Sequence, residues 1–338
     1  MIRFDDAAAF TRALATLPEP DASAIEAAAA RQAQLTKPAG SLGRLEEIAL
    51  FMAGWQRRER PRADCIRAAI FAGNHGVAAR GVSAFPPAVT AQMVENFRSG
   101  GAAINALAAA CGADLSVVPL DLDRPTADIC EAPAMTEAEC LHALNAGAAV
   151  VTPGTDLLFV GEMGIANTTP AAALCAQSFG GLASDWIGRG TGIDEAGLAR
   201  KADAVARALA LHGPHCTSAF ETLRRLGGRE IAAMAGAILA ARHLSVPMLL
   251  DGFISCAAVA PLARDNPAIT GHCLASHASA EAGHARLLHA LELRPLLHLD
   301  MRLGEGSGAA VAAQVVRSAL AAHGGMATFA EAAVAGAL

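Results

Sequence analysis

Short apolar runs alternate with longer alanine-rich stretches from residue 66 onward. The runs have the length of buried strands, and the stretches between them have the length of helices. The predicted strands are Ile66–Phe71, Leu115–Leu120, Asp156–Val160, Val246–Leu250 and Leu296–Leu299. The predicted helices include Thr90–Ala110, Thr169–Gln177, Asp194–Leu211, Glu230–His243 and Ser279–Leu291. This alternation predicts an α/β fold, in which helices cover both faces of a mostly parallel sheet.

The first 58 residues lack this alternation and read as helical. Asp21 or Ser23 suits the N-cap of one helix, and Ser41 suits the cap of a second helix that starts near Leu42. We expect residues 1–58 and the C-terminal helix, about 308–338, to form a small helical domain. Residues 59–307 would form the large α/β domain, with a polar loop at 121–139.

Composition narrows the function classes. The 338 residues are 53% hydrophobic, but the apolar runs are too short for a bilayer, and the stretch MIRFDDAAAF lacks the apolar segment of a signal peptide. We therefore expect a soluble, cytoplasmic protein without a membrane partner. The net charge of −6 and the lack of a basic patch argue against a nucleic-acid partner. The eight cysteines form no CxxC pair, which favours buried thiols over metal ligands or disulfides.

Glu305 is the first candidate for chemistry. It stands between Gly304 and Gly306 in MRLGEGSGAA, after the apolar run 295–300. Ligands of an open α/β sheet bind in the turns that follow strands, and glycines let the backbone approach a ligand closely. This position makes Glu305 a candidate working group.

A second candidate is GEMGIANTTPAAA, residues 161–173, where a strand leads through a glycine-rich turn into a helix. Thr168 or Thr169 suits the N-cap, and Pro170 suits the first turn. Free amides at such a helix start favour a phosphate ligand, although an ordinary strand–helix loop is the alternative.

A third candidate is GRGTGIDEAGLARK, residues 188–201. Its glycines, Gly190 among them, miss the spacing of the dinucleotide fingerprint but suit a loop around a phosphate. Only two of the 26 basic residues are lysines, and Lys201 lies within reach of an anion bound at this loop. A mobile surface loop with a solvated lysine is the alternative.

Two further segments carry weaker signals. Phe85, Gln92 and Met93 suit the wall of a pocket for a flat ring, although ordinary core packing explains them equally well. His75 follows a predicted strand, and a lone histidine at such a place more often has a structural role than a catalytic one.

In SHASAEAGH, residues 276–284, a capping box at the start of a helix is the simplest interpretation. The histidines from 272 to 289 lack zinc-site spacing, so no metal is expected.

These motifs together resemble a known family. LTKPAGSLGRLE, GNHGV, GEMGIANTTPAAA, GLARK, VPMLLDGFIS, SHASAE and MRLGEGSGAA follow one another in the order typical of the nicotinate-nucleotide–dimethylbenzimidazole phosphoribosyltransferases. The resemblance covers about residues 18–325. It implies a Rossmann-like sheet with a small helical domain, a homodimer, and no metal or redox cofactor. The implied substrates are nicotinate mononucleotide and 5,6-dimethylbenzimidazole.

The resemblance also implies residue roles. Glu305 matches the family's catalytic base and Glu162 its second active-site acid. The nucleotide would be held by the phosphate-proximal Lys201 together with Gly164, Asn167, Thr168, Gly190, Ser279, Gly304 and Gly306. The base would be held by Phe85, Gln92, Met93 and Leu303. Some relatives have aspartate in place of Asn74, and serine and glutamine in place of Phe85 and Met93, which leaves the base specificity open.

Three other functions remain to be separated from this one. The nearest is a transferase of the same family that acts on adenine, another benzimidazole or a phenol. A nicotinamide-dependent oxidoreductase would need the G-x-G-x-x-G fingerprint followed by an acid, which the chain lacks. A non-catalytic nucleotide-binding module would explain the glycine loops but not an acid between glycines.

Overall fold

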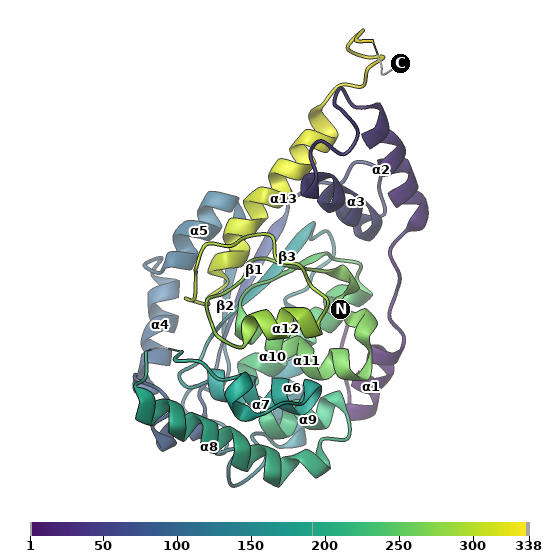
Figure 1. Cartoon of the computed structure of the whole chain (residues 1–338). Coiled ribbons are helices and arrows are strands. Elements are labelled where there is room, and N and C mark those ends of the chain that lie inside the picture. Colours follow the sequence, from purple (N-terminus) through teal and green to yellow (C-terminus); the bar gives the residue numbers. More distant parts are fainter. Residues whose placement is uncertain (1, 191, 336–338) are drawn as a thin grey trace.

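The computed structural model describes residues 2–190 and 192–335. Within these residues, the centre is one parallel sheet of five strands in the order β2-β1-β3-β4-β5 (Figure 1). The strands are β1 Ile66–Ala72, β2 Ala113–Pro119, β3 Leu157–Met163, β4 Met248–Leu250 and β5 Cys273–Ala275. The predicted α/β class with a parallel sheet is confirmed.

The strands are in a register that brings their carboxyl ends to one edge. Ile66 of β1 lies beside Ala113 and Leu157, the first residues of β2 and β3. The chain order reverses at β1, because β2 lies on one side of it and β3 on the other. Ligands of open α/β sheets bind outside the carboxyl ends at such a reversal.

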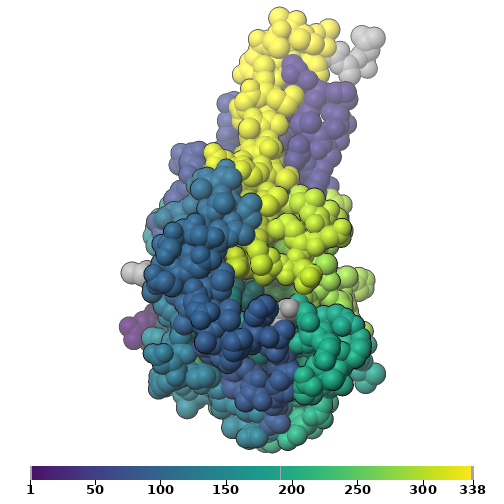
Figure 2. Space-filling model, turned by 90° about the vertical axis from the view of Figure 1, so that its left-hand side faces the viewer, coloured from purple at the N-terminus to yellow at the C-terminus, as the bar shows by residue number. Residues whose placement is uncertain are grey.

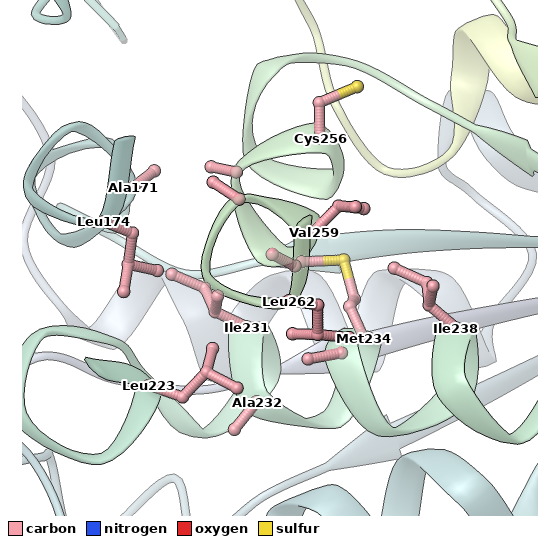
Figure 3. Packing of buried hydrophobic residues seen from close by; sticks show 14 of the residues in the cluster. Ala171, Leu174, Leu223, Ile231, Ala232, Met234, Ile238, Cys256, Val259 and Leu262 are labelled. Atoms are coloured by element: carbon pink, nitrogen blue, oxygen red, sulfur yellow. The ribbon is translucent and has the colours of Figure 1, made fainter. Parts of the chain in front are cut away.

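Apolar side chains alternate between two layers of core. On β1, Phe71 joins the cluster on one face of the sheet, and its neighbour Ile70 joins the cluster on the other. The first cluster includes the packing between α7, α9, α10 and α11 (Figure 3). Its helices are α1 Ala7–Ala15, α6 Glu137–Ala149, α7 Thr168–Phe179, α8 Glu195–His212, α9 Ala219–Leu226, α10 Arg229–His243, α11 Phe253–Asp265 and α12 His284–Ala290. The second cluster is built by α3 Arg44–Gln56, α4 Ala88–Arg98, α5 Ala103–Cys111 and α13 Ser307–Gly325.

Several predicted elements were wrong. The run Leu296–Leu299 is not a strand, because only Leu297 makes a bridge, to His277. The last strand is the earlier, three-residue β5. The single predicted helix at 90–110 is divided into α4 and α5 at Gly100, whose φ of +79° ends the helical path. The helix predicted from Ser279 starts only at His284, and α6 begins inside the segment predicted as a loop.

Helix α2 (Ala22–Gln34), α3 and the far end of α13 form a projection from the main body (Figures 1 and 2). The buried Arg31 on α2 donates to the carbonyl oxygens of His323 (2.9 Å), Gly324 (3.3 Å) and Met326 (2.9 Å). A cation at a helix C-terminus satisfies its last carbonyls. Helix α1 packs instead on α9 in the main body. Residues 336–338, the end of the predicted small domain, lie outside the described residues.

The start of α2 follows its predicted cap, since Asp21 accepts from the amide of Ala24. Ser41 is not a cap: the residue before α3 is Gly43, which has no side chain to bind the helix. Seven of the eight cysteines are buried free thiols, and Cys65 is exposed. Among the described helices, none has the length and apolarity needed to cross a membrane.

Candidate active site

A cavity of about 470 Å³ opens at the carboxyl edge of the sheet. Figure 2 shows this side of the molecule, where the blue segment of α4 and the yellow-green segment before α13 border a hollow. The cavity brings together Glu162, Gly164, Asn167, Thr168, Gly190, Ser279, Gly304 and Glu305, all predicted from the sequence. The structure therefore gathers segments that are far apart in the chain into one site.

Glu305 lies in a turn that leads directly into α13, and not after a strand as predicted. Three successive residues, Gly304, Glu305 and Gly306, have φ angles of +85°, +62° and +83°. Glycine adopts this region freely, but a residue with a side chain rarely does. Such a conformation at a non-glycine residue costs of order 1–3 kcal/mol and clusters at functional sites.

The turn is pressed against β3. A side chain on Gly161 would place its Cβ 2.3 Å from the carbonyl carbon of Glu305 and 2.4 Å from the amide nitrogen of Gly306. A side chain on Gly304 would meet Oε1 of Glu162 at 2.4 Å. These two glycines therefore allow Glu162 and the Glu305 turn to lie in direct contact.

The Glu305 carboxyl combines burial with an open acceptor position. It accepts a hydrogen bond from the backbone N–H of Ile104, near the start of α5. Its Oε2 has no partner in the described part of the chain. Burial raises the pKa of this carboxyl above its ordinary value, and the Ile104 amide opposes the rise. The result is a stronger base than a solvated carboxylate.

Glu162, on β3, has a different environment. Burial, followed by the charges of Glu230, Asp251 and Glu305, raises its pKa to about 8, although a hydrogen bond from the Asn167 amide opposes the rise. Glu162 is therefore mostly protonated at neutral pH and able to donate a hydrogen bond. The two acids lie side by side with different proton affinities, an arrangement typical of acid–base sites.

The two glycine loops meet through Lys201. Its Nζ on α8 donates to the hydroxyl of Thr168 (3.0 Å) and to the carbonyl of Gly188 (2.9 Å). Burial lowers the pKa of Lys201 to about 8. Helix α7 starts at Thr168, so its N-cap is Asn167 and not Thr168 or Thr169 as predicted. The helix amides, the loop and the buried cation together form a region that suits a phosphate.

The opposite wall is apolar. Phe85, Met93 and Leu303 line the cavity as predicted, together with Val89. Phe85 and Leu303 are 50% and 57% exposed, so large apolar surfaces lie at the cavity mouth. Gln92 is also on α4, but it is exposed and outside the lining, which contradicts its predicted place in the base pocket. Successive residues of a helix point in different directions, so Met93 and Gln92 do not share a face.

The capping-box interpretation of the SHASAE segment was wrong, because α12 starts later and has Gly283 before it. Ser279 accepts from the backbone amide of Glu281 and lines the cavity. Gly306 lies just behind the lining, where it precedes α13.

His75 and His272 have structural surroundings. His75 pairs with Glu230 at 2.7 Å in a fully buried contact. His272 contacts the backbone oxygens of Ile269 and Ile238, and burial lowers its pKa to about 3. Within residues 2–190 and 192–335, no group of three or more histidine, cysteine or acidic residues is placed to bind a metal ion.

Known proteins share this architecture. A family model described as "Phosphoribosyltransferase" matches residues 17–334. The chain belongs to this phosphoribosyltransferase family. A relative from Novosphingobium aromaticivorans, named nicotinate-nucleotide–dimethylbenzimidazole phosphoribosyltransferase, is 66% identical over 99% of both chains. One of the same name from Ruegeria pomeroyi is 57% identical over 97% of both. A solved structure of that name from Thermus thermophilus has a TM-score of 0.87 at 40% identity, and covers 94% of this chain and 100% of its own.

The sequence analysis of this phosphoribosyltransferase missed five polar residues of the cavity: Asp251, Ser255, His277, Glu281 and Arg302. Asp251 follows β4, and burial raises its pKa to about 7. His277 lies beside it, with Nδ1 3.0 Å from the hydroxyl of Ser276. Arg302 donates to the carbonyl of Gly190 at 3.3 Å. The position of Asp251 directly after a predicted strand was the available signal, since strand ends form the site.

Proposed function

We propose that this protein transfers the 5-phosphoribosyl group of nicotinate mononucleotide to 5,6-dimethylbenzimidazole. The products are α-ribazole 5′-phosphate and nicotinate, for the lower ligand of cobalamin. One observation carries the proposal: an acid with an open acceptor oxygen, Glu305, lies between a phosphate-type loop and an apolar wall. The names of the relatives support the same reaction.

The proposed step is a displacement at the anomeric carbon of the ribose. One ring nitrogen of the benzimidazole forms the new C–N bond, and the bond to nicotinate breaks with its electron pair going to the departing ring. Attack from the face opposite nicotinate converts the β-nucleotide into an α-nucleotide. The remaining ring N–H becomes acidic as attack proceeds, and Glu305 accepts its proton.

The other residues of the site position the two substrates. Lys201, Thr168 and the loop at Gly190 hold the phosphate end of the nucleotide, and the wall of Phe85, Met93 and Leu303 holds the flat base. The protonated Glu162 donates a hydrogen bond without adding a charge. Fixing two reactants in this way contributes roughly 7–11 kcal/mol to lowering a barrier.

A second candidate is the same transfer to another acceptor base, such as adenine, another benzimidazole or a phenol. The observation in its favour is the composition of the apolar wall. The side chains of Phe85, Val89 and Met93 cannot form strong hydrogen bonds to a base. An apolar wall discriminates weakly between flat rings of similar size.

The purified protein tests both candidates. It is incubated with nicotinate mononucleotide and an equimolar mixture of these bases, and the products are identified by mass and by the anomeric proton signal. We expect the α-riboside phosphate of 5,6-dimethylbenzimidazole to form first. Preference for another base supports the second candidate, and a β-product or no product contradicts both.

We also propose that the enzyme is a cytoplasmic homodimer, as the family resemblance implies. The exposed side chains of Phe85 and Leu303 at the cavity mouth suit coverage by a second copy. A chain of 34.3 kDa should then sediment at twice its mass, and a monomer at micromolar concentration would contradict the dimer.

A further inference from the structure

Helix α13 begins without a cap from its own segment. The first amides of any helix lack partners within the helix, and a side chain at the N-cap usually binds one of them. The N-cap here is Gly306, which has no side chain. The cap comes instead from Asp251: its Oδ2 accepts from the amide of Gly306 at 3.1 Å, and its Oδ1 from Ala309 at 2.9 Å.

Asp251 is itself held rigidly. It follows the last residue of β4, whose partners in the sheet are β3 and β5. Its backbone carbonyl accepts a hydrogen bond from the hydroxyl of Ser276 at 3.0 Å, and its side chain is only 3% exposed. The amides of α13 are therefore bound to a group that is fixed in the sheet.

The two bonds act on the turn that carries Glu305. Gly306 is the next residue after Glu305, so its amide and the Glu305 carbonyl belong to one peptide unit. Both Glu305 and Gly306 have positive φ angles, +62° and +83°, which the backbone does not favour at a residue with a side chain. Binding of the Gly306 amide by Asp251 resists relaxation of this turn.

Asp251 lines the cavity, but its oxygens are already occupied. Each of them accepts a helix amide, whereas Oε2 of Glu305 has no partner among the described residues. A carboxylate that accepted a substrate proton would weaken these amide bonds. Glu305 therefore has an oxygen free to accept a proton, whereas the oxygens of Asp251 are used to bind the start of α13.

We infer that Asp251 is a positioning residue for the phosphoribosyl transfer, which acts through Glu305 by fixing the start of α13. The inference rests on the proposed function, in which Glu305 accepts the proton. It assigns Asp251 no contact with the reacting atoms.

The test is a double-mutant cycle of Asp251→Asn and Glu305→Gln. Asp251→Asn keeps the shape of the side chain but places an amide donor against a backbone donor. We expect kcat to fall by about 10²-fold, because a small misplacement of a reacting group costs this much. The KM for nicotinate mononucleotide should stay close to that of the wild type. In the Glu305→Gln background, Asp251→Asn should change kcat little, because residues that act through one another are non-additive.

Asp265 offers a matched control. Its Oδ2 accepts from the amide of Ala219 at the start of α9, so it also caps a helix from another segment, but away from the cavity. Asp265→Ala should lower the melting temperature and leave kcat unchanged. An equal loss of kcat in this variant would reduce Asp251 to a general stability effect and overturn the inference.

Three further results would overturn it. The first is an unchanged kcat in Asp251→Asn, and the second is losses of kcat that add fully in the cycle. The third concerns the wild type alone: fast hydrogen exchange at the amides of Gly306 and Ala309 would contradict their hydrogen bonds to Asp251, even if the variants do not fold. A wild-type protein that transfers no phosphoribosyl group would instead contradict the proposed function.

Discussion

Glu162 and Glu305 show how one functional group acquires two roles from its surroundings. Both are buried, and burial raises both pKa values. Glu162 also faces the charges of Glu230, Asp251 and Glu305, and its pKa reaches about 8. Glu305 receives a backbone hydrogen bond that favours its ionised form. At neutral pH, therefore, Glu305 is the better candidate for the base and Glu162 for the hydrogen-bond donor.

The raised pKa values of Glu305 and Glu162 predict how kcat depends on pH. The rate should rise with pH while Glu305 loses its proton, and should fall above about pH 8 as Glu162 becomes charged beside it. Glu162→Gln should remove the fall in kcat and keep the rise, because a glutamine stays neutral. Lys201, whose pKa is also about 8, should change the KM for the nucleotide in this pH range in both proteins. The measurement is kcat from pH 5 to 10 for both proteins. A wild-type rate that stays constant above pH 8 would contradict the role of Glu162.

Lys201 gives a second test at this scale. Lys201→Ala should raise the KM for the nucleotide roughly 10- to 100-fold, since a hydrogen bond to a charged group is worth about 1.5–3 kcal/mol. The KM for the base should change little. Arg200 is the control, because it neighbours Lys201 on α8 and donates instead to the carbonyl of Gly81. Unchanged nucleotide affinity in Lys201→Ala would remove Lys201 from the phosphate region.

At the scale of elements, the site depends on close contact between β3 and the turn before α13. Gly161 provides this contact, since a Cβ there would lie 2.4 Å from the carbonyl oxygen of Glu305. The element that carries the proposed base is thus positioned by backbone packing as well as by its own sequence.

Gly161→Ala tests this dependence. The added methyl group must displace the turn, so kcat should fall by about 10²-fold. The stability should fall by about 1–3 kcal/mol, as overpacked sites do. The control is Gly324→Ala, also a glycine of the described chain but near the far end of α13, where a new Cβ would have no neighbouring atom within 4 Å. Its free energy of unfolding should rise by roughly 0.5–1 kcal/mol, because alanine loses less conformational entropy in a helix than glycine does. The measurements are kcat and thermal unfolding of both variants. A fully active Gly161→Ala would show that the site does not depend on close contact between β3 and the Glu305 turn.

The sequence predicted the elements whose signal is local. The apolar runs of β1 and β3 and the helices α7, α8 and α10 were found because their patterns are long and regular. β5 was missed because its three residues, Cys273–Ala275, belong to no longer apolar run, whereas the equally short β4 ends the run Val246–Leu250. Leu296–Leu299 was misread because only Leu296 and Leu297 pack on the core, and the pairing is limited to the single bridge at Leu297. Asp251 was missed because its partner amides are 55 and 58 residues further along the chain.

At the scale of the whole molecule, α13 attaches the projection, formed by α2, α3 and the end of α13, to the main body. Arg31 binds three carbonyls at the end of α13 while it is buried. The other half of α13 packs on the sheet. One helix therefore belongs to both the predicted small domain and the main body.

Arg31→Ala should loosen this attachment. The loss of charged hydrogen bonds to three carbonyls should lower the free energy of unfolding by about 1.5–3 kcal/mol. Hydrogen exchange should rise in α2 more than in the sheet. Arg12→Ala, at an exposed position on α1, should change neither quantity. Equal exchange in α2 for both variants would contradict the role of Arg31.

Helix α13 has a mechanical consequence. Its 19 residues make a rod about 28 Å long, with Glu305 just before one end and the projection at the other. Asp251 and Gly161 hold the Glu305 end of this rod against the sheet. The half of α13 nearer to Glu305 also packs on the sheet. A displacement of the projection would therefore have to move this packed half of the helix before it could change the position of the carboxylate.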